Sequence, residues 1–153
     1  EIEKRITTLS INILRLRAES ENKKLIFPED MKTDHPNLVD DALQLFQVRK
    51  NKNKALLEEQ EKILKNEKNS LKLLEEQVQI SKSLLEEQLT NRLKHLDLLK
   101  ERNAVLSKIE SSVSSIKKIK ETYETDVRTQ LLKEISEYEE LLERKNKFKD
   151  SLN

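Results

Sequence analysis

The sequence contains no cysteine, no glycine and no tryptophan, and it has only two prolines. The absence of cysteine removes any disulfide framework. Sheets, tight turns and phosphate-binding loops rely on glycine for positive φ angles and close backbone approach, so its absence argues against most α/β and all-β enzymes. Long apolar runs are also missing, because none approaches the roughly 18 residues that a membrane-spanning helix needs. What remains is a composition suited to helices.

The sequence also has no excess of positive or negative charge. The chain carries 30 Lys and Arg against 29 Asp and Glu, a net charge of +1, although 39% of its residues are charged. A duplex-binding protein concentrates basic residues on one face, and no segment here is strongly basic, so we expect no direct nucleic-acid binding. The polar faces mix both signs, which disfavours a helix lying on a membrane. We expect an intracellular protein, and its first residue, Glu1, indicates part of a longer chain.

The two prolines, Pro28 and Pro36, mark the only clear breaks in a helix-forming sequence. Proline lacks an N–H and pushes the residue before it out of the helical region. We therefore predict an all-α fold with three parts. A short N-terminal amphipathic helix covers residues 1–25, a Pro-containing loop covers residues 26–37, and a long coiled-coil region covers residues 38–153, with room for one bend or hairpin.

Apolar residues recur at alternating spacings of three and four, which is the pattern of a coiled-coil seam. Polar residues interrupt this seam, and repeated spacings of four between Tyr123 and Ile135 form a stutter that locally unwinds a supercoil. Such a drifting register favours unlike partner helices over a homodimeric zipper. The predicted partner-binding residues are Ile2, Ile6, Leu9, Ile13, Leu16, Phe46, Leu57, Leu64, Leu71, Leu74, Val78, Leu85, Leu106, Ile109, Val113, Ile116, Tyr123, Ile135, Tyr138 and Leu142. For Phe46, packing against the N-terminal helix is an equal alternative, whereas Tyr123 and Tyr138 are expected to anchor a partner.

The region beyond Pro36 raises the question of where its apolar stripe is buried. We expect Asn37 to cap a helix there, and a straight helix to the C-terminus would extend roughly 170 Å at 1.5 Å per residue. Residues 66–70 and 110–115 are rich in Asn and Ser, which compete for backbone hydrogen bonds, so they are candidate turns; the alternative is solvated helix. A rod cannot cover its own stripe. We therefore expect this region to borrow a hydrophobic interior from neighbouring chains.

Groups suited to catalysis or metal binding are sparse. The two histidines, His35 and His95, fall in different elements, and a metal site needs three or four convergent ligands. Adjacent glutamates such as Glu75 and Glu76 point in different directions on a helix, so a solvated face explains them. We expect no catalytic residue, no metal and no cofactor.

Three stretches together suggest a family. They are Asn22-Lys23-Lys24, Phe27-Pro28-Glu29-Asp30, and Leu73-Leu74-Glu75-Glu76-Gln77-Val78-Gln79-Ile80. In this order they resemble centromere protein K, over residues 9–90. The resemblance implies a short helix, a Pro-containing linker and a long coiled coil. It also implies an inner-kinetochore subunit in the nucleus that pairs lengthwise with the related protein H, without a catalytic residue.

Two functions remain open from the sequence. The first is a structural scaffold subunit of a hetero-oligomeric coiled-coil complex, in which polar seam residues help to select partner and register. The alternative is an autonomous helical-bundle adaptor, or a coiled coil that tethers vesicles or the cytoskeleton. The bundle requires true turns within the long region, and neither reading describes an enzyme.

Overall fold

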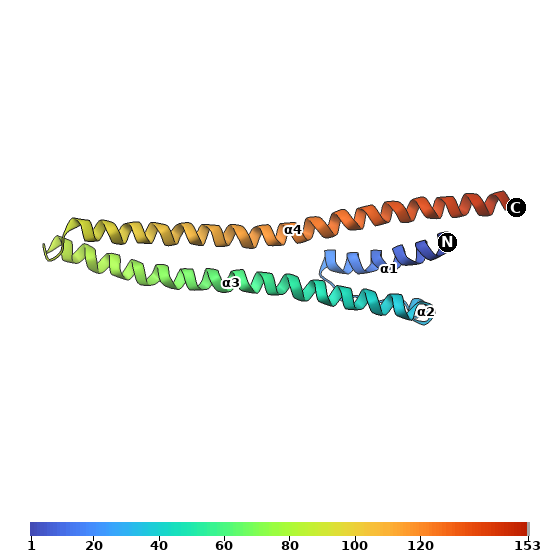
Figure 1. The fold of residues 1–153 in the computed structure, drawn as a ribbon, viewed down its shortest axis with the longest axis horizontal. Coiled ribbons are helices and arrows are strands. Elements are labelled where there is room, and N and C mark those ends of the chain that lie inside the picture. Colours follow the sequence, from blue (N-terminus) through green and yellow to red (C-terminus); the bar gives the residue numbers. More distant parts are fainter. Residues whose placement is uncertain (153) are drawn as a thin grey trace. The chain divides into compact units, whose positions relative to one another are not determined.

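The computed structural model describes residues 1–152, and within them the chain is helical without any strand (Figure 1). The helices are α1 (Ile2–Glu21), α2 (Glu29–Asp34), α3 (Pro36–Glu86) and α4 (Arg92–Leu152). The predicted all-α fold class is confirmed. The chain forms two compact units, which we call unit 1 (residues 1–54 and 121 onward) and unit 2 (residues 55–120).

The N-terminal helix ends at Glu21, earlier than predicted. Asn22 adopts a left-handed conformation with φ 53° and ψ 45°. With this conformation, the N–H of Lys23 donates a hydrogen bond to the carbonyl of Ala18 at 2.9 Å. The N–H of Asn22 donates to the carbonyl of Glu19 at 3.4 Å. Asn tolerates left-handed backbone better than most residues, so Asn22 can end the helix without glycine.

The segment predicted as a loop, residues 26–37, is only partly a loop. It contains α2, which follows Pro28, and α3 begins within it at Pro36. The prediction that Asn37 caps the long helix is therefore wrong, because Asn37 lies inside its first turn. Proline is favoured at the first helical position, since the N–H that it lacks would have no partner there.

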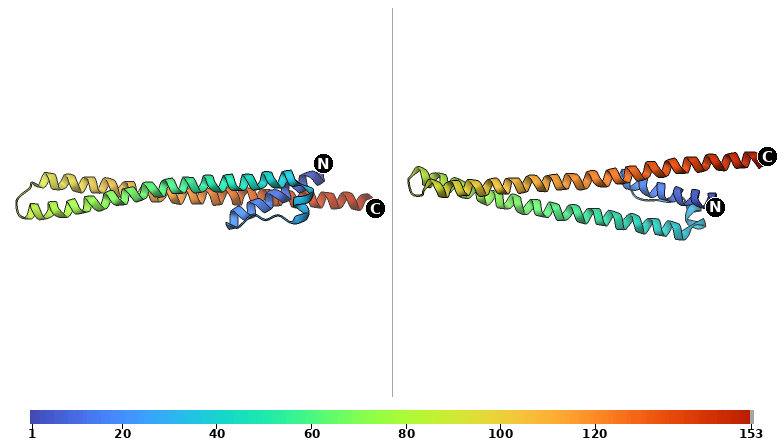
Figure 2. Two further views of the ribbon diagram at one scale, coloured as in Figure 1. Left: turned by 90° about the horizontal axis from the view of Figure 1, so that it is seen from below. Right: turned by 45° about the horizontal axis from the view of Figure 1, so that its top comes forward.

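Unit 1 has a hydrophobic core of its own. In Figure 1 and in the right-hand view of Figure 2, α1 lies between the first part of α3 and the last part of α4. Leu9, Leu16 and Val127 are the largest fully buried side chains. A second group of buried side chains joins α1 to the start of α3 and to the connecting segment: Ile11, Phe27, Val39 and Ala42. The expectation that residues beyond Pro36 lack an interior within their own chain is wrong for this unit.

Unit 2 is an antiparallel helical hairpin made from the second part of α3 and the first part of α4 (Figure 1). The chain turns at residues 87–91. Neither candidate turn is used: residues 66–70 and 110–115 are both helical, which was the alternative for each stretch. Residues 38–152 are thus not one continuous helix.

The turn is built without glycine. Gln88 takes the left-handed conformation with φ 59°, and the N–H of Leu89 donates to the carbonyl of Leu84 at 2.8 Å. This bond closes the end of α3 in the manner of a Schellman motif. Asn91 then caps α4, because its Oδ1 accepts a hydrogen bond from the N–H of Lys94 at 2.9 Å.

Candidate protein-interaction surfaces

Most predicted seam residues of unit 2 face the other helix of the same hairpin. Those buried or half-buried within it are Leu57, Leu64, Leu71, Leu74, Val78, Leu85, Ile109 and Ile116. Leu106 and Val113 are different, because they are 39% and 49% exposed. The 3–4 spacing therefore identified a true seam, which α3 and α4 close on each other.

Polar side chains in the seam of unit 2 fix how its two helices are aligned. The hydroxyl of Ser112 donates to Oε2 of Glu67 at 2.7 Å, and Nδ1 of His95 shares a hydrogen bond of 3.0 Å with the hydroxyl of Ser81. Sequence reasoning left His95 without a role and missed both pairs. Since buried polar groups need partners, a slip of either helix would leave these groups unpaired.

The remaining predicted residues lie in unit 1 and are buried or half-buried there. They are Ile2, Ile6, Leu9, Ile13 and Leu16 in α1, Phe46 in α3, and Tyr123, Ile135, Tyr138 and Leu142 in α4. Phe46 packs within its own chain, one of the two alternatives that its sequence position allowed. Partner binding by these residues stays a prediction.

A polar cluster around the buried Glu19, formed with Arg15, Arg49 and Tyr123, joins α1 to the parts of α3 and α4 in unit 1. The side chain of Glu19 in α1 is only 1% exposed. One of its oxygens pairs with the guanidinium of Arg15 on the next turn of α1. The other accepts hydrogen bonds from Nε of Arg49 in α3 at 2.6 Å and from the hydroxyl of Tyr123 in α4 at 2.9 Å.

Contacts within the cluster also shift the pKa values of two of its side chains, Tyr123 and Arg49. The guanidinium of Arg49 lies 5.8 Å from the centre of the Tyr123 ring, within the range of a cation–π contact. Burial, together with the hydrogen bond to Glu19, raises the pKa of Tyr123 to about 12. The hydrogen bond to Glu19 raises the pKa of Arg49 as well. Tyr123 and Glu19 are 104 residues apart, so no local pattern could have paired them.

Exposed ion pairs connect the N-terminal end of α1 to α4. Arg5 donates through Nε and a terminal nitrogen to the two carboxylate oxygens of Glu137, at 2.9 and 3.0 Å. This fork-shaped contact holds the pKa of Glu137 below its usual range. Lys145 lies 3.5 Å from Glu3 nearby. Exposed pairs of this kind contribute little to the free energy of unfolding.

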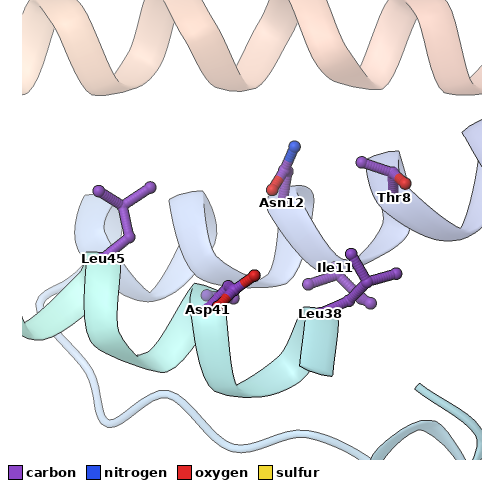
Figure 3. Close-up of a pocket in the computed structure, with 7 residues that line it drawn as sticks. Thr8, Ile11, Asn12, Leu38, Asp41 and Leu45 are labelled. Carbon is purple, nitrogen blue, oxygen red and sulfur yellow. The ribbon is translucent and has the colours of Figure 1, made fainter. Parts of the chain in front are cut away.

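A small groove of about 120 Å³ lies between α1 and the start of α3 (Figure 3). Thr8, Ile11 and Asn12 come from α1, while Leu38 and Leu45 come from α3. Small-molecule sites usually occupy about 300–1,000 Å³, so this groove has room for little more than one side chain.

Unit 2 carries two further rows of apolar side chains outside its seam. The α3 outer row contains Leu56, Ile63, Leu73, Ile80 and Leu84, and each is exposed. The α4 outer row contains the exposed residues Leu96, Leu106 and Val113, together with the half-buried Leu99. The gaps between successive members are 7, 10, 7 and 4 residues in the α3 outer row and 3, 7 and 7 in the α4 outer row, so each row stays on one helix face with polar residues between its apolar ones. Each helix of unit 2 therefore has one face for its partner within the chain and a second apolar face that this chain leaves open.

Among the described residues, no group of three or more His, Cys, Asp and Glu side chains is placed to hold a metal ion. Within the same residues, no helix combines the length and the apolar character that crossing a bilayer demands.

Comparisons with known proteins add little to this description. No family model matches the chain, and no curated protein matches it either. Among solved structures, it is similar to a crystal structure of the soluble domain of LipC, a membrane fusion protein of a type I secretion system. The identity is 20% and the TM-score 0.46, over 94% of this chain and 83% of that chain. A likeness this distant says nothing about what the present chain binds.

Proposed function

We propose that this chain is a structural scaffold: a helical-hairpin subunit of a larger coiled-coil complex that binds other helical chains and has no catalytic role. The observation that carries the proposal is the second apolar face on each helix of unit 2. Leu73 and Ile80, for example, are 62% and 60% exposed although they belong to one regularly spaced row. Single exposed apolar residues are common, but a row of them at coiled-coil spacing marks a contact surface.

The seam of unit 2 is closed within the chain, and this limits which surface of unit 2 can bind another chain. Since Leu64 and Leu71 already face α4, they can reach another chain only if the hairpin opens. The two outer rows need no such change. We therefore assign partner binding first to the outer rows, and among the residues predicted from sequence to Leu106 and Val113.

A finer proposal places the complex at the inner kinetochore. It is supported by the resemblance of residues 9–90 to centromere protein K, and it would make the partners unlike chains, with protein H foremost. Co-expression with protein H tests it: a stable complex of the two chains would support the assignment, and separate elution of folded chains would contradict it.

The second candidate, an autonomous helical-bundle adaptor, is favoured by unit 1. There α1 closes over parts of α3 and α4 with buried Leu9, Leu16 and Val127, so this unit resembles a small bundle. The two candidates differ in what they expect of unit 2. A scaffold uses its outer rows, whereas an adaptor needs only the surface of the bundle.

Affinity capture from cells, followed by mass spectrometry, distinguishes the candidates. The bait is the full chain, compared with Leu73→Glu/Ile80→Glu, which charges the α3 outer row, and with Leu89→Glu, an equally exposed leucine of the turn. The scaffold proposal expects identified helical partners that the first variant loses and the second retains. Partners that remain with both variants would favour the adaptor.

A further inference from the structure

We propose that unit 2 forms a symmetric dimer, in which α3 of one copy packs antiparallel against α3 of a second copy, with the two-fold axis level with Lys68. This inference rests on the proposed scaffold function and deepens it, because it names a second copy as the occupant of one open face. Two observations carry it: the exposed face of α3 is an unbroken coiled-coil seam, and that seam and its flanking charges are complementary to themselves in one antiparallel register.

The exposed apolar residues of α3 belong to a face with regular coiled-coil spacing. Polar residues fill the positions between the members of the α3 outer row, so that steps of three and four residues alternate without a fault. We call these nine residues the α3 outer face: Leu56, Glu59, Ile63, Asn66, Ser70, Leu73, Gln77, Ile80 and Leu84. Every one of them is exposed, and the face spans about four heptads, the length at which such a pattern indicates a coiled coil. The stutter between Tyr123 and Ile135, which disfavours a homodimeric zipper along the whole chain, lies outside this span.

The α3 outer face is separate from the seam that closes the hairpin. Each residue of the face directly precedes a buried or half-buried seam residue, as Leu56 precedes Leu57 and Leu84 precedes Leu85. One residue corresponds to a rotation of about 100° around a helix, so the face points roughly a quarter-turn away from α4. A second helix can therefore pack against α3 while the hairpin stays closed.

A two-fold axis level with Lys68 matches the apolar part of this face to itself. In an antiparallel pair with that centre, residues equally far from Lys68 on its two sides lie level with each other. Leu56 then meets Ile80 of the second copy, and Ile63 meets Leu73 of the second copy. Each contact occurs twice by symmetry, so the four apolar residues from each copy form one continuous interface.

The polar residues of the face meet each other in the same register. Asn66 lies level with Ser70 of the second copy, next to the axis, and Glu59 lies level with Gln77. The amide of Asn66 can bond to the hydroxyl of Ser70, and the amide nitrogen of Gln77 can donate to the carboxylate of Glu59. Between residues 56 and 80, no apolar residue of the face is then opposite a polar one.

Charges beside the face are complementary as well. Lys62 and Glu76 each directly precede a residue of the face, so both lie on the same flank. In the proposed register, Lys62 comes within about 3 Å, measured along the helix axis, of Glu76 of the second copy. This pair occurs twice, and residues that flank a coiled-coil seam select partner and orientation through such pairs. On the other flank, the hydroxyl of Ser112 holds the carboxylate of Glu67 within its own copy at 2.7 Å.

Other contacts of this face with itself fit less well. Moving the axis half a heptad toward the start of α3 places Ile63 against Asn66. Moving it equally far toward the turn places Leu73 against Ser70. A parallel contact in register would bring Glu59 of both copies together, with like charges opposed inside the interface. Since a face that matches itself under a two-fold rotation is what an isologous dimer requires, we assign a second copy as its occupant.

Exchanging charges in the full chain tests the register. In homodimers of Lys62→Glu or of Glu76→Lys, like charges would oppose each other at both flanking pairs. A mixture of these two variants restores both pairs, and so does the double variant Lys62→Glu/Glu76→Lys. We expect each single variant to dimerise about five- to tenfold more weakly than the wild type, and the mixture and the double variant to recover to within about twofold. Sedimentation equilibrium at low salt measures the dissociation constants, and circular dichroism checks helicity.

Charging the face itself tests the surface. Leu73→Glu/Ile80→Glu should be a folded monomer, because two apolar contacts on each side of the axis are lost. The matched control, Leu106→Glu/Val113→Glu, charges two exposed residues of the α4 outer row and should dimerise like the wild type. Should the first variant lose helicity, Leu73→Gln/Ile80→Gln replaces it.

Single spin labels locate the two-fold axis. Glu61, Lys68, Glu75 and Lys82 lie seven residues apart on one exposed side of α3, so the sideways separation between copies is similar for all four. Labels at Glu61 and at Glu75 should give equal distances between copies, because each pair is about 21 Å apart along the helix axis. Labels at Lys68 should be closer than these, and labels at Lys82 further apart, with about 42 Å along the axis.

A wild type that stays monomeric over a wide range of concentration would overturn the inference, and so would a dimer that survives Leu73→Glu/Ile80→Glu. Unequal distances at Glu61 and Glu75 would contradict the register, and equal distances at all four labelled positions would indicate a parallel contact; either result overturns the proposed dimer. If the wild type is monomeric but captures a different helical protein through an outer row, the proposed scaffold function stands and only the identity of the occupant fails.

Discussion

At the scale of single residues, Glu19 in α1 has polar partners in α1, α3 and α4. Burying a carboxylate costs several kcal/mol unless it is paired and hydrogen-bonded. Its pairing here comes from Arg15 in its own helix, Arg49 in α3 and Tyr123 in α4. The position of α1 is therefore tied to both neighbouring helices by one side chain.

Replacing Glu19 by alanine should lower the free energy of unfolding by about 3 kcal/mol, because the guanidinium of Arg15 would stay buried without its carboxylate. Urea unfolding followed by circular dichroism measures this. Glu21→Ala, an exposed glutamate of the same helix, is the matched control and should change the free energy by less than about 0.5 kcal/mol. Equal effects of the two substitutions would show that the cluster contributes nothing specific.

The raised pKa of Tyr123 predicts a stability change in alkali. Its pKa is about 12 in the folded chain against an ordinary value of 10.0, so the folded state holds the phenol proton more tightly. The stabilisation is complete below pH 10 and is lost as the pH rises through about 12. Ultraviolet titration of the wild type minus Tyr123→Phe should give a midpoint near 12. A difference curve centred near 10 would contradict the buried hydrogen bond.

At the scale of elements, the turn at residues 87–91 is the feature that determines the fold of unit 2. It depends on a left-handed Gln88 and on the cap of α4 by Asn91. Left-handed backbone costs a residue with a Cβ atom roughly 1 kcal/mol, and glycine avoids that cost. The turn is thus specified by the cap and by the seam, rather than by the residue type that usually ends a helix.

Gln88→Gly should therefore raise the free energy of unfolding by about 0.5–1 kcal/mol, because it removes the left-handed strain. A thermal melt followed by circular dichroism measures the gain. Glu86→Gly, in the last turn of α3, is the control and should be destabilising by about 0.5–1 kcal/mol. A loss of stability in Gln88→Gly would mean that the left-handed residue is not where the structure has it.

Spin labels distinguish the hairpin from a continuous rod. Labels at Lys62 and Ser114 should lie within about 30 Å, since packed helix axes are about 8–10 Å apart. A rod would separate the same positions by about 78 Å. Labels at Ala55 and Ser83 are the control, because both lie in α3 and should be about 42 Å apart in either case. Diluting labelled chains with unlabelled ones removes distances between copies.

The helices and the seam of unit 2 could be predicted from sequence, but the turn and the polar contacts could not. The spacing from Leu57 to Leu85 is local, so it identified the buried face of α3. Residues 87–91 were not among the candidate turns; residues 66–70 and 110–115 were, with solvated helix as the alternative, and the structure has helix at both. The contact of Glu19 with Tyr123 depends on chain topology, which periodicity does not contain.

At the scale of the whole molecule, burial is distributed unevenly between the two units. Every apolar residue that is buried in the described chain belongs to unit 1, except Val78 in unit 2. The seam of unit 2 also includes Ser81 and Ser112, which are buried polar residues. Regions with few buried apolar contacts open more readily than those with many.

Amide hydrogen exchange of the monomer should therefore be slower in unit 1 than in unit 2. We expect the strongest protection around Leu9 to Leu16 and around Val127, and weaker protection from residue 60 to 85. Exchange at low protein concentration, read by mass spectrometry, measures this order. Uniform protection would imply one cooperative unit, whereas protection of unit 2 that grows with concentration would report its association with other copies.

The turn at residues 87–91 has a practical consequence. It is the one stretch between α3 and α4, Leu89 is 68% exposed there, and each unit takes helices from both sides of it. We therefore expect the fold to tolerate a break in the chain within this stretch. Two separately expressed fragments, severed after Leu89, should reassemble spontaneously, and reporter halves fused at the cut would turn that reassembly into a signal.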